Sequence, residues 1–123
     1  MALVAQLDPA GGTPIAYVGT FLAFWIGYSL TAHIAARYVL GDVSVRRALL
    51  VGPVPAAASI LLQQYGPAIS IAVTLFGDYL AIQSVYRLNY RLAGLVAIVH
   101  YTVTVILGIT LANLIGLLST APT

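Results

Sequence analysis

The residues best suited to chemistry in this sequence are one aspartate and one histidine that lie within apolar segments. Asp78 stands in TLFGDYLAIQSVYR, residues 74–87. If the chain folds back at Asn89, then Asp78 and His100, each eleven residues from Asn89, lie at the same depth. An ionised aspartate at the centre of a bilayer costs about 2.5–3.5 kcal/mol, so Asp78 needs a partner or a proton. We therefore predict that Asp78 and His100 touch and share a proton.

The polar residues around this pair extend along one face of each predicted helix. Ser70 and Thr74 precede Asp78 at intervals of four, and Thr104 follows His100 at the same interval. Two roles stay open: a structural clasp, in which Asp78 accepts a hydrogen bond from His100 or Tyr101, and a proton- or ion-handling site. The candidates for the second role are Asp78, His100, Thr74, Thr104, His33 and Tyr101.

His33 offers a further interpretation. It lies four residues before Arg37, and its default role is a hydrogen bond across the helices. Together with His100 it would alternatively supply two axial ligands to a haem, as in membrane b-type cytochromes.

Enzyme chemistry finds no support in the motifs. The chain contains no H-E-x-x-H, no G-x-S-x-G and no phosphate-binding glycine loop. The letters LFGD match only the end of the G-x-G-D motif of intramembrane aspartyl proteases, because Leu75 replaces the first glycine. We expect a non-enzymatic protein with no cofactor and no metal site.

The composition indicates a membrane protein. Of 123 residues, 61% are hydrophobic and 7% charged, where a soluble domain has roughly 25% charged residues; the mean hydropathy is +1.01. Without cysteine, disulfides and thiolate chemistry are excluded. The basic pI arises from only five arginines near helix ends, so we expect the lipid bilayer, and no nucleic acid, as a partner.

Short turns with glycine, proline or asparagine separate four apolar runs. They predict one all-α domain over residues 1–123, an up-down bundle of four transmembrane helices. The predicted helices span about 14–38, 44–64, 67–87 and 90–118. All five arginines flank the turns 39–43 and 88–90, which the positive-inside rule makes cytoplasmic. We expect a multi-pass protein of the cytoplasmic membrane with both termini outside.

Prolines should distort the second helix. Pro53 and Pro55 lie near its middle, where proline removes a backbone donor and clashes with the preceding turn. We predict a kink there, with the carbonyls of Leu49 and Val51 left without their helical partners.

Two small-residue faces are predicted to mediate close helix packing, within the chain or between subunits of an oligomer. They repeat the pattern G-x-x-x-A-x-x-x-G in the first and fourth helices and comprise Gly19, Ala23, Gly27, Gly108, Ala112 and Gly116.

In architecture the chain resembles small multidrug transporters and fluoride channels. It has no glutamate for the first, however, and only Phe76 where the second would carry several phenylalanines. As a whole it resembles uncharacterised small membrane proteins of halophilic archaea, which implies no activity. Two functions remain: a structural or accessory membrane subunit, forming a homo-oligomer or binding another membrane protein, and a small proton-linked transporter or channel that uses Asp78 and His100.

Overall fold

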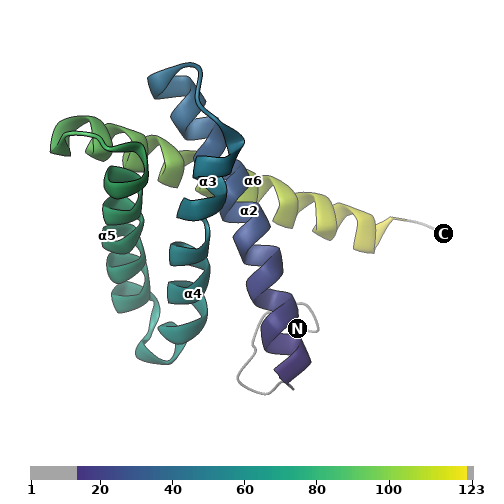
Figure 1. Ribbon diagram of the computed structural model, residues 1–123. Coiled ribbons are helices and arrows are strands. Elements are labelled where there is room, and N and C mark those ends of the chain that lie inside the picture. The colour runs from purple at the N-terminus through teal and green to yellow at the C-terminus, as the bar shows by residue number, and fades with distance from the viewer. Residues whose placement is uncertain (1–13, 122–123) are drawn as a thin grey trace.

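The computed structural model describes residues 14–121, and the expectations about the terminal segments lie outside these residues. Within that range the chain is helical and has no strand (Figure 1). The elements in order are α2 (Pro14–Leu40), α3 (Val45–Val51), α4 (Pro53–Leu61), the 3-10 turn η2 (Gln63–Tyr65), α5 (Pro67–Tyr86) and α6 (Tyr90–Thr120). The all-helical class is therefore confirmed. Three helices, α2, α5 and α6, are long and apolar enough to cross a membrane.

The turns follow from local backbone chemistry. Gly41 has a φ of +90°, and its N–H donates to the Arg37 carbonyl, which ends α2 with a left-handed glycine. Asn89 occupies the N-cap of α6, where its side chain accepts a 2.8 Å hydrogen bond from the Leu92 N–H. The predicted reversal at Asn89 is thus present.

The second predicted helix is interrupted at Gly52, where α3 gives way to α4. The backbone stays helical there, since the Gly52 N–H donates to Ala48 and the Gly52 carbonyl accepts from Ala56. Pro53 lacks the N–H that would bind the Leu49 carbonyl. The Trp25 indole of α2 donates to that carbonyl over 2.8 Å. The proline segment therefore gives two shorter helices, and one freed carbonyl gains a partner from another helix.

The helix α6 departs from the predicted up-down arrangement. In Figure 1 it crosses the group formed by α2–α5, and its C-terminal half extends beyond them. Its buried residues are confined to the first third, Ala93, Val96, Ala97 and His100. Every residue from 108 to 121 is exposed. The other helices therefore cover only the first half of α6.

The apolar core occupies the end of the molecule at which α2 and α5 finish. It is built largely from small side chains of four helices, and its buried members are Ala32, Ala35, Ala36, Ala48, Val51, Ile82, Tyr86, Val96 and Ala97. Arginines stand beside the same end, as shown by Arg47, whose guanidinium lies 6.0 Å from the centre of the Tyr86 ring.

Candidate functional site

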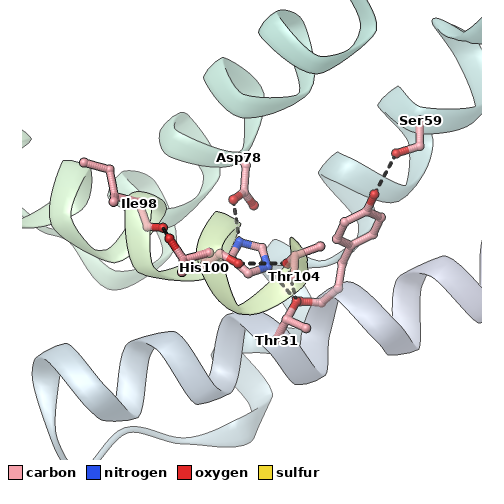
Figure 2. A network of polar contacts seen from close by, with 8 residues as sticks. Thr31, Ser59, Asp78, Ile98, His100 and Thr104 are labelled. Atoms are coloured by element: carbon pink, nitrogen blue, oxygen red, sulfur yellow. Dashed lines mark hydrogen bonds and ion pairs between the residues drawn. The ribbon is translucent and has the colours of Figure 1, made fainter. Parts of the chain in front are cut away.

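The buried pair Asp78 and His100 forms the centre of the site (Figure 2). Asp78 comes from α5 and His100 from α6, and they are only 4% and 2% exposed. His100 Nδ1 lies 2.5 Å from Asp78 Oδ2. The predicted contact is therefore present, and it brings the only carboxylate within α5 and α6 against an imidazole.

A third helix completes the environment of the imidazole. Thr31 Oγ1, from α2, lies 2.8 Å from His100 Nε2. Thr104 Oγ1 lies 3.1 Å from Thr31 Oγ1 and 2.8 Å from the His100 carbonyl. Figure 2 shows these side chains converging on one point from α2, α5 and α6. The network therefore connects the three long helices.

The hydroxyl of Thr31 lets the network hold His100 in either protonation state. When both imidazole nitrogens carry protons, Nε2 donates to Thr31, which can donate in turn to the Tyr28 carbonyl over 3.1 Å. When Nε2 is unprotonated, the Thr31 hydroxyl can rotate to donate to it, and Thr104 can donate to Thr31. A proton can thus leave Nε2 without leaving His100 unpartnered.

A cavity of about 140 Å³ adjoins the pair. Besides Asp78 and His100, its polar lining consists of Tyr28, Ser59, Ser70, Thr74, Tyr101 and Thr104. The volume exceeds several-fold the roughly 10–15 Å³ that a single water molecule requires. The cavity therefore has both the room and the polar groups to be hydrated.

Several hydrogen-bonding groups at the cavity have no partner within the described part of the chain. Asp78 Oδ1 is buried and accepts no hydrogen bond. The hydroxyls of Ser70 and Thr74, one and two turns along the same face of α5, also make no hydrogen bond among residues 14–121. By contrast, Ser59 donates to the Pro55 carbonyl over 2.7 Å. Three polar groups of α5, each in a residue that lines the cavity, therefore have no hydrogen-bond partner among residues 14–121.

The cavity and the core lie on opposite sides of the pair. The cavity lining on α4 and α5 runs from Asp78 towards η2, reaching Ser59 and Ser70. In the other direction Ile82, Val51 and Val96 are fully buried in the core. The pair thus lies between the cavity on one side and the apolar core on the other.

Two predicted site residues stand apart from the network. His33 Nδ1 is buried and has no hydrogen-bond partner among the described residues. Tyr101 lines the cavity but does not donate to Asp78, which is bound by His100. Because Asp78 and Thr31 occupy both ring nitrogens of His100, neither nitrogen is available to iron, and the residues present do not fit a bis-histidine haem.

The predicted small-residue faces do not pack closely within the chain. A Cβ atom added at Gly19, Gly27, Gly108 or Gly116 would meet nothing within 4 Å. The prediction of close intrachain packing is wrong for these glycines, and a groove between α2 and α6 lies at Gly27 and Gly108. The alternative, packing between subunits, stays a prediction.

The close helix contact lies instead at Gly52. A Cβ atom there would overlap Ser29 Oγ and lie 2.8 Å from the Trp25 carbonyl oxygen of α2. Ala48, Gly52 and Ala56 are all buried at intervals of four, which is a small-xxx-small face. The sequence contains this spacing, but the two prolines between these residues predict a kink and not a close contact.

Thr31, which contacts His100 from 69 positions away, is a site residue that the sequence did not predict. No local pattern distinguishes Thr31 from other hydroxyl residues of the long helices. Its role depends on which face of α2 meets α6.

The fold and the site define a class: an all-helical protein with long apolar helices compatible with a membrane and a buried polar network between them. More particularly, the chain belongs to a family of unknown function, DUF7473, whose model matches residues 11–122. No curated protein and no solved structure shows a significant match to the chain.

Proposed function

We propose that this protein crosses the membrane four times and moves protons, as a small transporter or channel in which Asp78 and His100 carry the proton. The observation that carries this proposal is the environment of Asp78. One carboxylate oxygen binds His100, while the other has no partner among the described residues and belongs to a residue that lines the cavity. Leaving a buried acceptor unsatisfied is costly, so a purely structural clasp would favour a dry, fully paired carboxylate.

The fourth crossing is assigned to α3, α4 and η2 together. Residues 45–65 would extend roughly 30 Å at 1.5 Å per residue, which matches the thickness of a hydrocarbon core. The arginine-bearing turns then lie on the cytoplasmic side. In this orientation the cavity lies on the outer side of Asp78 and the apolar core on the inner side.

The proton step follows from the hydrogen bonds of His100. When neutral His100 carries its proton on Nε2, a proton that has reached Asp78 from the cavity can pass to the unprotonated Nδ1, and the proton on Nε2 can then pass to the hydroxyl of Thr31. Passage to the inner side requires the core to open, because Ile82 and Val51 are fully buried beyond the pair. Alternating access to the two sides would then carry the proton across the membrane.

A structural role is the second candidate, since the network joins α2, α5 and α6 at one place. Interhelical hydrogen bonds in membranes average about 0.6 kcal/mol, so such a clasp would stabilise the fold modestly.

Proton flux into proteoliposomes separates the two functions. The parent protein, with a pH-sensitive dye inside the vesicles, should carry protons down an imposed gradient faster than empty liposomes do. Asp78→Asn should abolish this flux. The matched control is Asp42→Asn, because Asp42 is fully exposed and bound only to Arg37, over 3.6 Å. A parent flux equal to that of empty liposomes, with gradients of either sign, would leave only the structural role.

A further inference from the structure

The polar groups of the cavity residues that lack a hydrogen-bond partner suit a ligand that is both a cation and a hydrogen-bond donor. Asp78 Oδ1 can only accept while the carboxylate is ionised, and the hydroxyls of Ser70 and Thr74 can accept beside it on the same face of α5. Asp78 and Thr74 are one helical turn apart, about 6 Å along the axis, which one ammonium group can bridge with two N–H bonds. An ammonium group has up to three or four such bonds in a compact volume.

The remaining walls of the cavity suit a short alkyl chain. Pro55 of α4 and Ile71 and Leu75 of α5 contribute apolar surface. The rings of Tyr28 and Tyr101 also line the cavity, and aromatic rings attract cations over their faces. The volume of about 140 Å³ suits a small amine and not a large drug-like cation.

We propose that the cavity between α4, α5 and α6 is a binding site for a small primary ammonium cation, which competes with the proton held by Asp78 and His100. The inference rests on the proposed proton-linked transport and names its substrate class. The ammonium group donates to Asp78 Oδ1 and to the Thr74 hydroxyl, and its alkyl chain lies against the apolar wall.

Competition follows from the charge of the site. With His100 protonated, the pair is neutral and holds a second cation poorly. With His100 neutral, the buried carboxylate of Asp78 is uncompensated, which favours entry of a cation. Of the elements that line the cavity, α2 contributes Tyr28, α6 contributes His100 and Tyr101, and α4 contributes no titratable group. No other charged residue lines it, so one cation should exchange for one proton.

The test uses isopropylammonium as the probe and the purified full-length protein, with binding measured by calorimetry. We expect saturable binding whose affinity rises by about tenfold per pH unit where one proton is displaced. Tetramethylammonium, which has no N–H, and sodium should bind at least about tenfold more weakly. Equal binding of tetramethylammonium, or affinity independent of pH from 5 to 9, would overturn the inference.

Two variants locate the binding. Asp78→Asn should abolish it, and Thr74→Val, which preserves shape, should weaken it about fivefold, the effect of one hydrogen bond. Thr110→Val is the matched control, because Thr110 is exposed outside the cavity and its hydroxyl binds only the Ile106 carbonyl. The assignment of binding to this cavity would be contradicted if the affinity for isopropylammonium were unchanged in Thr74→Val, or if it fell equally in Thr110→Val.

The two proposals fail separately. Proton flux in the parent without isopropylammonium binding overturns the ammonium site and leaves proton transport standing. Binding that depends on pH and on Asp78, without any flux, supports the ammonium site and overturns transport.

Discussion

The contact at Gly52 gives a prediction whose size follows from the geometry. In Gly52→Ala the new methyl group would overlap Ser29 Oγ and lie 2.8 Å from the Trp25 carbonyl oxygen. Overpacking a core costs about 1–3 kcal/mol, while alanine gains about 1 kcal/mol over glycine in a helix. Because a backbone atom cannot turn away as a side chain can, we place the cost near its upper end. The free energy of unfolding should fall by about 2 kcal/mol.

The fluorescence of Trp25 provides the assay for this prediction. Trp25 is the only tryptophan, and its indole donates to the Leu49 carbonyl three residues before Gly52. Its fluorescence, followed during titration with sodium dodecyl sulfate in mixed micelles, reports unfolding and the loss of this helix contact together.

Two further variants test the reasoning. Gly27→Ala adds the same methyl group where nothing lies within 4 Å, so it should not destabilise the protein. Ser29→Ala removes the nearest atom and should restore part of the stability of Gly52→Ala, since Ser29 Oγ is itself buried without a partner among the described residues. The close packing of α2 on α3 and α4 would be refuted if Gly52→Ala were as stable as the parent, or if Gly27→Ala were destabilised to the same extent.

The remaining predictions concern the site and the topology. If the pair stabilises the fold, Asp78→Asn and His100→Gln should each lower the free energy of unfolding in the same assay. The loss in the double variant should be smaller than the sum of the two single losses by about 0.6–1.7 kcal/mol. Strict additivity would mean that the two side chains do not interact. Thr31→Val, which removes the hydroxyl at His100 Nε2, should slow proton flux while changing stability by no more than about 1.5 kcal/mol, and an unaltered flux would exclude Thr31 from the path. Cysteine introduced at Gln64 should react with an impermeant thiol reagent added outside cells, whereas cysteine at Asn89 should not, and the reverse pattern would invert the proposed orientation.

The composition of the chain predicted the class of this protein, and the spacing of residues about Asn89 predicted the central contact of its site. A chain with 61% hydrophobic and 7% charged residues has far fewer charged residues than a soluble domain, and three of its helices are long and apolar enough to cross a membrane. The contact between Asp78 and His100 was predictable because Asn89 caps α6 immediately after α5 ends. In such a short connection, the helical rise relates sequence separation directly to depth.

Only the tertiary structure decided how the other helices meet this hairpin. Thr31 reaches His100 because one face of α2 packs against α6, and Gly52 is the closest approach because its neighbours on α2 leave no room for a methyl group. The cavity beside Asp78 likewise depends on the separation of α4, α5 and α6. The predicted glycine faces lie in open space for the same reason, since α6 crosses the other helices and leaves their contact after its first half (Figure 1). Crossing geometry is set by the side chains of both helices at their contact, and the sequence of one helix does not contain it.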